Sequence, residues 1–585
     1  MFEKVLVANR GEIAVRIFRT LRELGVAGVA VYSDADRTAL HVAYADEAYA
    51  LGGLTAAESY LAVDKLLDAA QRARAQAVHP GYGFLAENAG FARAVEAAGL
   101  VWIGPPPEAI ELMGSKTRAR QAMRAAGVPI VPGTTDSVDS ADDVARLGEE
   151  IGYPLLIKAA AGGGGKGMKI VRSPDEAAQA FESARREGQS YFADASVYVE
   201  RYLEDPRHVE VQVLADAHGN VIHLGERDCT IQRRHQKLVE ETPSPAVGPD
   251  LRKRIGAIAV DAARAAGYRS AGTIEGLLSP EGDYFFMEMN TRIQVEHTVT
   301  ELVTGLDLVR EQVLIAAGEP LSLRQEDVQI RGHAIECRIN AEDPSNGFLP
   351  SPGRITSYRE PAGPGIRVDS GVTAGAEITG LYDPMFAKLI VHDVDREAAR
   401  RRMLRALGEF ELGGVKSLLG FHQALLSHPC FIEGATCHGV VESEQLAQRA
   451  EQFDHPPTVA AASDGSLAER TTVAEVDGRR VEVKVLVPEP PYRALARRRR
   501  ARAASNAGAR ESGVVASPMQ GTVLAVTVAV GDTVRAGQVL CIVEAMKMEN
   551  EVTAHWAGTV TEVSVSPGAP VTTGQRICVI EAEPG

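Results

Sequence analysis

The sequence has few cysteines and no long hydrophobic run, and both absences restrict what the chain can be. Its 585 residues include six cysteines, without a CxxC pair among them. This pattern indicates neither a zinc site nor a disulfide framework, and it fits a reducing cytoplasm. No apolar stretch is long enough to span a bilayer, and the chain opens without a charged and then apolar leader. We therefore expect a cytoplasmic protein that does not enter the membrane.

An excess of positive charge is also missing. The formal net charge is −16 and the sequence pI is near 5.5, and an acidic surface repels nucleic acid and anionic membranes. The local run Arg497 to Arg500 is an exception. In so acidic a chain it favours a solvated linker or docking segment over a nucleic-acid patch.

The length exceeds what one hydrophobic core supports, so we expect several domains. The chain opens with a βαβ pattern: strand-like Lys4 to Ala8, a helical spacing from Gly11 to Leu24, and strand-like Val29 to Tyr32. A helical segment from Lys116 to Ala126 then leads into a buried-strand pattern from Gly152 to Lys158.

Residues 445 to 512 differ in composition from the chain on either side. They are rich in Ala, Glu, Pro and Arg and contain one candidate hairpin, Val473 to Val487, which would turn at Asp477 and Gly478. This stretch predicts a linker long enough for a swinging tether, with a candidate docking element.

The last part of the chain contains an internal repeat. Eight residues recur at one constant offset, each as the same residue type: Gly521, Val523, Val526, Gly531, Val534, Gly537, Cys541 and Glu544 return as Gly558, Val560, Val563, Gly568, Val571, Gly574, Cys578 and Glu581. Two copies of one β unit, alternating apolar and polar residues with glycines at the turns, predict a small flattened barrel.

Between the two copies lies the segment Glu544 to Glu549, which symmetry places at an exposed hairpin tip. A lysine at a tip is usually a solvated charge, but Lys547 has methionines on both sides, and exposed apolar pairs usually serve recognition. The segment matches the Ala-Met-Lys-Met motif of biotinyl domains. By that resemblance Lys547 carries biotin, whereas lipoyl domains typically place their lysine between Asp and Ala.

A glycine-rich segment, Ala160 to Met168, lies between two strand-like runs. Its glycines fit the dinucleotide fingerprint formally, but that motif must open a helix, and Gly165-Lys166 lacks the Ser or Thr of a P-loop. The isolated match at Gly81 to Ala86 is also weak, so we reject NAD binding. A flexible loop between two strands is the arrangement that closes over ATP in ATP-grasp enzymes.

A third pattern, Ala271 to Arg292, predicts a hairpin. With Glu281 and Gly282 as a two-residue turn, Glu275 lies directly opposite Glu288. Facing carboxylates destabilise a hairpin unless a cation lies between them, and oxygen ligands favour Mg²⁺ or Mn²⁺. A solvent-exposed polar face with a shifted register is the alternative.

Several motifs together resemble biotin carboxylase: residues 5–14, Arg233 to Lys237, Glu288 to His297 and Gly332 to Asp343. The resemblance reaches about residue 443, and the biotinyl resemblance covers about 512 to 583. It implies an α/β multidomain chain of the acyl-CoA carboxylase α-subunit type. The implied order is a Rossmann-like preATP-grasp N-terminal domain (1–114), an ATP-grasp domain (115–330), an α+β biotin carboxylase C-terminal domain (331–444), a linker (445–512) and an all-β flattened-barrel (barrel-sandwich hybrid) biotinyl domain (513–583).

The resemblance also implies a set of site residues, carried over position by position. The ATP ligands would be Lys116, Lys158, Gly163, Gly164, Gly165, Glu200, Leu203, His208, Gln232 and His235. The metal ligands would be Glu275 and Glu288, with Asn290 nearby. Bicarbonate would contact Lys237, Arg292, Gln294, the Val295 backbone and Glu296, with Glu296 as the base, and Arg338 would stabilise the biotin enolate.

This chemistry explains the residue types. In the family, bicarbonate attacks the γ-phosphate of ATP, and the carboxyphosphate formed breaks down beside the biotin ring. Lysines and Mg²⁺ offset the crowded phosphate charge, and a guanidinium such as Arg292 grips a planar anion through two hydrogen bonds. Departures from the family pattern are Thr298 in place of a proline, Ala161 in place of a glycine and Gly276 in place of an aromatic residue.

The implied partners are bicarbonate, ATP, a biotin protein ligase and a separate carboxyltransferase β subunit, because no carboxyltransferase segment is evident. A carboxylase dimer within a larger hetero-oligomer of fatty acid metabolism is expected. Two alternatives come from other classes: another ATP-grasp ligase with a lipoyl-type carrier, and a non-catalytic scaffold. The sequence does not name the acyl-CoA, because that pocket belongs to the partner.

Overall fold

The contacts within the chain divide it into two compact units. The first unit consists of residues 1–378 and 385–454, and the second of residues 379–384 and 455–585. In this computed structural model the described residues are 1–134, 136–159, 168–192, 194–453, 467–476, 479–488, 513–545 and 548–581. The glycine-rich segment from Gly163 to Gly165 and the candidate biotin site Lys547 therefore lie outside the described residues.

The first unit begins with a parallel sheet in the order β3-β2-β1-β4-β5. Its strands are β1 (Lys4–Val7), β2 (Ala27–Tyr32), β3 (Glu47–Ala50), β4 (Ala77–His79) and β5 (Val101–Trp102). Its helices are α1 (Gly11–Glu23), α2 (Leu40–Tyr44), α3 (Val63–Ala73), α4 (Ala89–Ala97) and α5 (Pro107–Gly114). The predicted βαβ opening is confirmed, and the strand order reverses between β1 and β4, where ligands bind in open α/β sheets.

The side chain of Asn9 joins the ends of β1 and β4 at this reversal. Its Nδ2 donates to the carbonyl oxygens of Pro80 and Tyr82, both at 2.7 Å. Gly81 has a positive φ of 63°, and an added Cβ there would lie 3.1 Å from Asn9 Nδ2. This glycine therefore serves a tight turn against Asn9.

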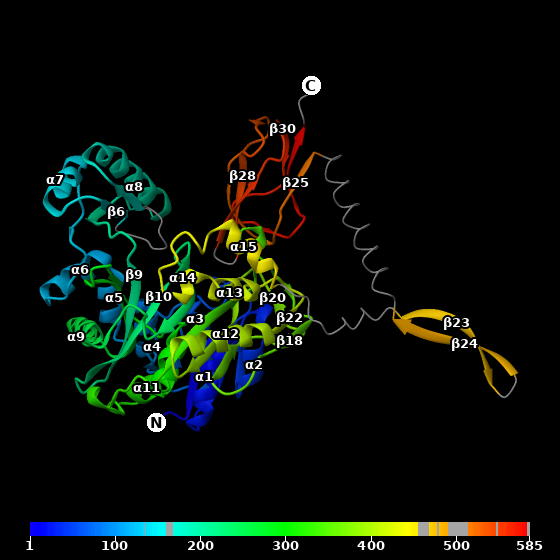
Figure 1. The fold of residues 1–585 in the computed structure, drawn as a ribbon, viewed down its shortest axis with the longest axis horizontal. Helices are drawn as coiled ribbons and strands as arrows, with labels where there is room; N and C mark the ends of the chain where they lie inside the picture. The colour runs from blue at the N-terminus through cyan, green and yellow to red at the C-terminus, as the bar shows by residue number, and fades with distance from the viewer. Residues whose placement is uncertain are drawn as a thin grey trace. The chain divides into compact units, whose positions relative to one another are not determined.

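A separate lobe follows helix α6 (Lys116–Ala125), and in Figure 1 it is coloured cyan to teal. It contains a three-stranded antiparallel sheet in the order β7-β6-β8 with helices α7 and α8. The elements are β6 (Leu155–Ala159), β7 (Met168–Val171), β8 (Val197–Arg201), α7 (Ala141–Ile151) and α8 (Ala177–Phe192). Buried Val144, Leu155, Ile157 and Phe181 give the lobe its own core. The glycine-rich segment thus connects two paired strands, β6 and β7, as predicted.

An eight-stranded antiparallel sheet runs through the centre of the first unit in the order β13-β12-β9-β10-β11-β14-β21-β19. Its strands are β9 (Arg207–Ala215), β10 (Val221–Arg233), β11 (Gln236–Thr242), β12 (Ser270–Leu278), β13 (Tyr284–Asn290), β14 (His333–Asn340), β19 (Ile366–Ser370) and β21 (Met385–Asp393). Strand β11 pairs with β14, with Val239 opposite Cys337. One sheet is therefore continuous across the proposed ATP-grasp and C-terminal domains.

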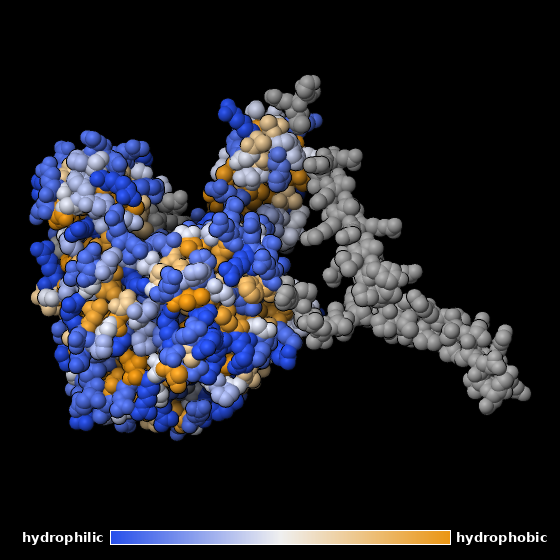
Figure 2. Space-filling view, in the orientation of Figure 1, coloured by the Kyte–Doolittle hydropathy of each residue, from blue (hydrophilic) through white to orange (hydrophobic). Residues whose placement is uncertain are grey.

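Further helices and short strand pairs complete the description of the first unit. The helices are α9 (Pro249–Ala265), α10 (His297–Thr304), α11 (Leu308–Ala316), α12 (Arg396–Glu409), α13 (Leu419–Leu426), α14 (Pro429–Ile432) and α15 (Glu444–Glu451). The short pairs are β15 (Glu342–Asp343) with β16 (Leu349–Pro350), β17 (Gly353–Arg354) with β20 (Glu377–Ile378), and β18 (Ser357–Arg359) with β22 (Glu411–Gly413). Figure 2 shows hydrophilic residues over most of the visible face, with hydrophobic residues in separate areas.

The β12–β13 hairpin confirms one prediction and corrects another. Glu275 lies opposite Glu288, as predicted. The turn, however, is longer than the predicted Glu281-Gly282 pair, since the last paired residues are Leu278 and Tyr284. A register shift after Glu275 leaves an extra residue on β13, which compensates for the longer turn and restores the carboxylate pairing.

The cysteine prediction was wrong for one pair. Cys430 and Cys437 form a disulfide, whereas Cys229, Cys337, Cys541 and Cys578 are buried free thiols. The spacing of the pair is not a CxxC motif, so nothing in the local sequence indicated it. The fold alone brings the two Cα atoms to 5.4 Å.

In the second unit, the repeat forms two four-stranded sheets, β25-β32-β30-β27 and β29-β28-β26-β31. The strands are β25 (Val514–Ala516), β26 (Gly521–Val526), β27 (Thr533–Val534), β28 (Val539–Ala545), β29 (Met548–Thr553), β30 (Gly558–Val563), β31 (Pro570–Val571) and β32 (Arg576–Glu581). Each strand of one sheet has its repeat-related counterpart at the same place in the other sheet: β25 with β29, β32 with β28, β30 with β26, and β27 with β31. The predicted two-copy barrel is therefore confirmed.

Equivalent glycines allow equivalent close approaches in the two copies. An added Cβ at Gly521 would lie 2.2 Å from the carbonyl oxygen of Glu544, and one at Gly558 would lie 2.2 Å from that of Glu581. A side chain at either position would push the paired strands apart. Strands β28 and β29 pair up to Ala545 and Met548, and the two residues between them, one of which is Lys547, lie outside the described residues.

The predicted hairpin of the linker is present and longer than expected. Strand β23 (Leu467–Val476) pairs with β24 (Arg479–Pro488), and Val476 lies opposite Arg479. The predicted turn residues, Asp477 and Gly478, lie outside the described residues. Across the part of the chain that the structure describes, no helix combines the length and apolarity needed to cross a membrane.

Candidate active site

Lys237, at the start of β11, lies among three carboxylates, of which Glu210 and Glu275 are on strands of the central sheet and Glu296 is at the start of α10. Its Nζ donates to Glu210 Oε2 at 2.5 Å, Glu275 Oε1 at 2.9 Å and Glu296 Oε1 at 2.7 Å. Burial alone would lower the pKa of Lys237, but the three carboxylates raise it well above its ordinary value. The ammonium therefore stays charged and serves as a fixed electrostatic anchor.

Glu296 is shared between two cations. Lys237 donates to its Oε1, and Arg338 Nη2 donates to its Oε2 at 2.9 Å. Burial alone would raise the pKa of Glu296, but Lys237, Arg338 and Arg227 hold it well below the ordinary value. An anion that drew these cations away would raise this pKa and make the carboxylate a better proton acceptor.

Arg338, on β14, has a second carboxylate partner. Its Nε donates to Glu240 Oε1 at 2.6 Å across the β11–β14 pair. Burial raises the pKa of Glu240 to about 7, although Arg338 acts in the opposite direction. The guanidinium is thereby held between Glu240 and Glu296.

Glu275 connects the candidate metal and bicarbonate residues. Its Oε1 accepts hydrogen bonds from Asn290 Nδ2 and Gln294 Nε2, each at 2.7 Å. The amide oxygen of Asn290 accepts from Arg292 Nη2 at 3.0 Å, and Arg292 Nε donates to Glu87 Oε2 at 2.9 Å. Side chains predicted to act together are thus in direct contact.

The carboxylate pair fits a divalent cation. Burial raises the pKa of Glu288, and the charge of Glu275 raises it further. A cation between the two carboxylates would offset both the burial of their charges and their mutual repulsion. His208, Glu210 and Glu275 also bring ligand atoms within 4.8 Å of one another. Carboxylate and amide oxygens are the ligands that Mg²⁺ prefers.

The predicted nucleotide residues form a second group. Lys158 Nζ pairs with Glu200 Oε1 inside the lobe, and Arg120 Nη1 lies 3.1 Å from Glu200 Oε2. Burial lowers the pKa of Lys116. The charge of Lys158 lowers this pKa further, whereas the charges of Glu288 and Glu200 act to raise it. Lys116 is therefore within electrostatic reach of Glu200 in the lobe and of Glu288 in the carboxylate pair.

Four further nucleotide candidates lie on or near strands β9 and β10. The ring Nδ1 of His208 is 3.1 Å from Gln232 Nε2. Strand β10 pairs with β11 as far as Arg233 and Gln236, so Arg234 and His235 form the turn. Both have positive φ, 46° and 63°, a turn conformation that favours Asn or Gly and is costly here. Leu203 lies between β8 and β9.

Sequence reasoning missed the buried residue that holds this site in place. Arg227 is fully buried. Its guanidinium donates to Glu210 at 2.6 Å, to Gln294 at 2.7 Å and to Gln212 at 2.8 Å, and also to Thr273 and Thr300. Alternation in β10 could not reveal this role, because charged residues in a strand usually indicate a solvent face.

A second missed group lies behind Val295. Lys388, fully buried in β21, donates from Nζ to the Val295 carbonyl oxygen at 2.6 Å and lies 3.4 Å from Glu12 Oε1. The hydroxyl of Tyr82 donates to Glu12. Burial raises the pKa of Glu12 to about 7, although Lys388 acts to lower it.

Two departures from the family pattern have structural explanations. The hydroxyl of Thr298 donates to buried Glu336 Oε2, a hydrogen bond that proline could not make. At Gly276 an added Cβ would lie 2.3 Å from Tyr284 Cζ, so the ring of Tyr284 fills the space of a side chain. The third departure, Ala161, lies outside the described residues.

The antiparallel sheet, the lobe with a glycine-rich connection between two strands, and the lysines facing paired carboxylates define an ATP-grasp ligase. Residues 1–110 match the biotin carboxylase N-terminal domain, 115–324 the ATP-binding domain of the carbamoyl-phosphate synthase L chain, 336–443 the biotin carboxylase C-terminal domain, and 513–580 the biotin-requiring enzymes.

Individual proteins agree with these matches. The chain is 48% identical over 570 residues to the biotin-dependent acyl-coenzyme A carboxylase alpha3 subunit of Mycobacterium leprae, covering 94% of each chain. It is 40% identical to the propionyl-CoA carboxylase alpha chain of Ruegeria pomeroyi, covering 95% of this chain and 96% of that one. It is 54% identical over 434 residues to a pyruvate carboxylase subunit of Methanothermobacter thermautotrophicus, covering 74% of this chain and 88% of that one.

A solved structure resembles the first unit. The biotin carboxylase domain dimer of Hydrogenobacter thermophilus 2-oxoglutarate carboxylase, in complex with MgADP, ADP and bicarbonate, is 48% identical, with a TM-score of 0.72, and covers 76% of this chain and 99% of that one. The chain belongs to the biotin carboxylase family and carries a biotinyl domain on the same polypeptide. ATP, Mg²⁺ and covalently bound biotin are the cofactors of this enzyme class.

Proposed function

We propose that this chain is the α subunit of an acyl-CoA carboxylase, which carboxylates biotin on its own C-terminal domain and depends on a separate β subunit for carboxyl transfer. The observation that carries the subtype is the 48% identity to an acyl-coenzyme A carboxylase α subunit over 94% of both chains, biotinyl domain included. In this proposal Lys547 holds biotin, whose ureido nitrogen supplies the carboxyl acceptor.

The contacts around Glu296 support an order of events at the bicarbonate site. Bicarbonate is an anion, and Lys237 and Arg292 are the cations that would bind it, with Gln294 and the Val295 backbone orienting it. Once bicarbonate shares Lys237, Glu296 loses part of the charge that lowers its pKa. Glu296 then accepts the bicarbonate proton, and the freed oxygen attacks the γ-phosphate of ATP, so that carboxyphosphate forms and ADP leaves with the bridging oxygen.

Positive charge near the transferred phosphoryl group has several sources in this proposal. Lys116 and Lys158 would contact ATP with the residues 163–165, Glu200, Leu203, His208, Gln232 and His235. Glu275, Glu288 and Asn290 would hold Mg²⁺ or Mn²⁺, which neutralises charge on the phosphates. Arg338, whose guanidinium is held by Glu240 and Glu296, would stabilise the negative charge that develops on the ureido oxygen of biotin.

A second candidate is a subunit of a pyruvate carboxylase, favoured by the 54% identity to the Methanothermobacter thermautotrophicus protein. That identity covers 74% of this chain, whereas the acyl-coenzyme A carboxylase relative covers 94%. The chemistry on biotin would be the same, and the acceptor of the carboxyl group would differ.

The test has two stages. Purified chain with ATP, Mg²⁺ and bicarbonate should cleave ATP in a bicarbonate-dependent way, and a lack of such cleavage contradicts the carboxylase proposal. The chain with its co-purified partner should then fix ¹⁴C-bicarbonate onto one of a panel of acyl-CoAs. Fixation onto pyruvate with none of the acyl-CoAs would favour the second candidate.

A further inference from the structure

The Cys430–Cys437 disulfide closes a loop that touches the return segment, residues 202–206, which leads from the lobe to the central sheet. Cys430 lies in α14, and the backbone N–H of Ala435 donates to the Cys430 carbonyl oxygen at 2.8 Å. The disulfide adds a second closure at Cys437. In a reducing compartment, disulfides are usually transient, catalytic or redox-sensing.

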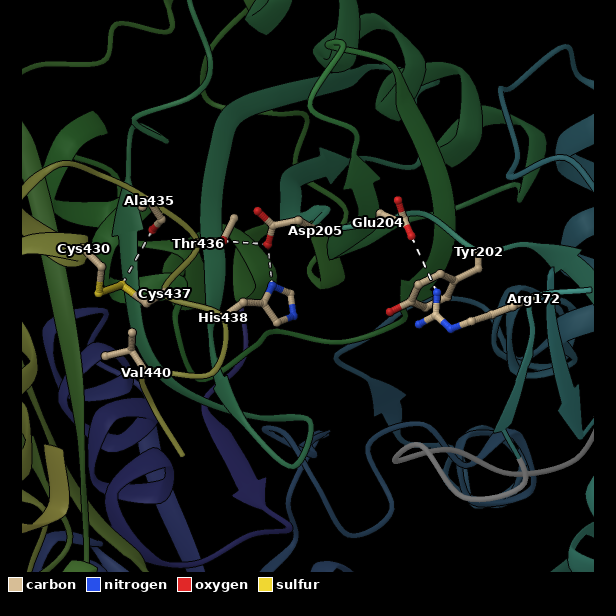
Figure 3. Close-up of a pocket in the computed structure, with 10 residues that line it drawn as sticks. All are labelled: Arg172, Tyr202, Glu204, Asp205, Cys430, Ala435, Thr436, Cys437, His438 and Val440. Carbon is tan, nitrogen blue, oxygen red and sulfur yellow. Dashed lines mark hydrogen bonds and ion pairs between the residues drawn. A yellow bond between two sulfur atoms is a disulfide. The ribbon is translucent and has the colours of Figure 1, made fainter. Parts of the chain in front are cut away.

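Both neighbours of Cys437 bind one carboxylate of the return segment (Figure 3). Thr436 Oγ1 donates to Asp205 Oδ1 at 2.7 Å, and His438 Nδ1 lies 2.5 Å from the same oxygen. Asp205 has a φ of +46°, which is uncommon for a residue other than glycine. Through these two contacts the disulfide loop is tied to the return segment at Asp205.

The return segment matters because of what lies on either side of it. Strand β8 ends just before it and contains Glu200, which pairs with Lys158. Strand β9 follows it and contains His208 and Glu210. Leu203, a candidate nucleotide ligand, lies within it. A shift at Asp205 would move lobe residues relative to those of the sheet.

The disulfide can be reached from solvent. Cys430 and Cys437 line a pocket of about 510 Å³ together with Arg172, Tyr202, Glu204 and Asp205. Figure 3 shows the sulfur atoms on one side of this pocket and Arg172, paired with Glu204, on the other. Cys437 is 4% exposed, whereas Cys430 is less buried, which favours Cys430 as the residue that an incoming thiolate attacks.

We propose that Cys430 and Cys437 form a thiol–disulfide exchange site for a dithiol, and that its redox state controls the nucleotide-binding lobe through Asp205. A thiolate of the dithiol attacks Cys430 Sγ, forming a mixed disulfide and releasing the Cys437 thiolate, which takes up a proton. The second thiol of the dithiol then releases Cys430 as a thiol. Two electrons and two protons pass to the cystine, and the dithiol becomes a disulfide.

Reduction frees Cys437 from α14 and loosens the two adjacent hydrogen bonds to Asp205. Because one such hydrogen bond contributes modestly, we expect the KM for ATP to rise roughly fivefold on reduction. The change in KM for ATP rests on the proposed function, because it assumes the proposed nucleotide site. The redox state of the two cysteines is measured independently of that function, by chemical labelling.

The experiment compares full-length chain treated with diamide and with dithiothreitol, alkylated and analysed by mass spectrometry, with KM for ATP measured on each sample. We expect blocked cysteines at 430 and 437 after diamide, free ones after dithiothreitol, and a higher KM in the reduced sample. The double variant Cys430→Ser, Cys437→Ser should have the reduced KM under both treatments. In the variant Asp205→Ala the KM for ATP should no longer differ between the two treatments. The control variant is Asp175→Ala, which removes an exposed carboxylate of the same lobe and should keep the difference.

The outcomes separate this proposal from the carboxylase proposal. Bicarbonate-dependent ATP cleavage with one KM in both redox states overturns the exchange site and leaves the carboxylase standing. Cysteines 430 and 437 that stay alkylable after diamide also overturn it. Because treatment of the wild-type chain is sufficient, a double variant that fails to fold does not prevent the test.

Discussion

The buried ammonium of Lys388 and the carbonyl oxygen of Val295 are 2.6 Å apart, and this contact fixes the backbone next to Glu296 from behind. Lys388 is on β21, and Glu12 and Tyr82 follow strands of the parallel sheet. Three separate parts of the chain therefore meet behind the candidate bicarbonate segment.

Replacing Lys388 by Met should weaken bicarbonate use more than ATP use. The variant loses the hydrogen bond to Val295 and leaves Glu12 without its cation, at a cost of about 3 kcal/mol in the free energy of unfolding. We expect a higher KM for bicarbonate with an unchanged KM for ATP, measured by coupled ATP hydrolysis. Lys253→Met, on the exposed face of α9, is the control, and equal changes in both KM values would refute a positioning role.

Arg338→Ala should keep ATP binding and lose carboxylation. The guanidinium lies between Glu240 and Glu296, and losing a contact that meets developing charge typically costs ~3 kcal/mol in the barrier, a rate loss on the order of a hundredfold. Free biotin as acceptor and calorimetric ATP binding separate the two effects. Normal biotin-dependent turnover would contradict the role.

Glu12 should make stability depend on pH. Its pKa is about 7 in the folded chain against an ordinary value of 4.5, so the folded state holds this proton more tightly than the unfolded state. The stability from this proton is complete below pH 4.5 and is lost as pH rises through 7. Melting curves should show wild type losing stability relative to Glu12→Gln between about pH 5 and 7.5, on the order of a few degrees. A constant difference would be inconsistent with the raised pKa.

Lys547→Arg should abolish biotinylation, since the ligating enzyme needs the lysine amine. After expression with a competent biotin ligase, a streptavidin blot should detect the wild-type chain and miss the variant. Carboxylation of free biotin should stay normal in both, which shows that the first unit is intact. A signal at full strength in the variant would exclude Lys547 as the attachment site.

The sequence predicted those features that depend on local spacing. The two-copy barrel followed from identical residues at a constant offset, and the facing of Glu275 and Glu288 followed from strand alternation. The predicted turn was too short, but the register shift after Glu275 compensated for it. The βαβ opening also followed from apolar periodicity.

The remaining features depend on contacts between distant segments. Arg227 and Lys388 are single charged residues in strands, and only the fold shows that both are fully buried among acceptors. Likewise, Cys430 and Cys437 form a disulfide because the turn after α14 brings them together. No periodic pattern encodes such contacts.

The β11–β14 pairing has a consequence for how the chain can be divided. A fragment ending at residue 330 would expose the β11 edge as a bare ladder of backbone donors and acceptors, which invites association with other chains. It would also remove Arg338, the partner of Glu240. The nucleotide half is therefore expected to precipitate when expressed alone, whereas residues 1–443 keep this edge covered.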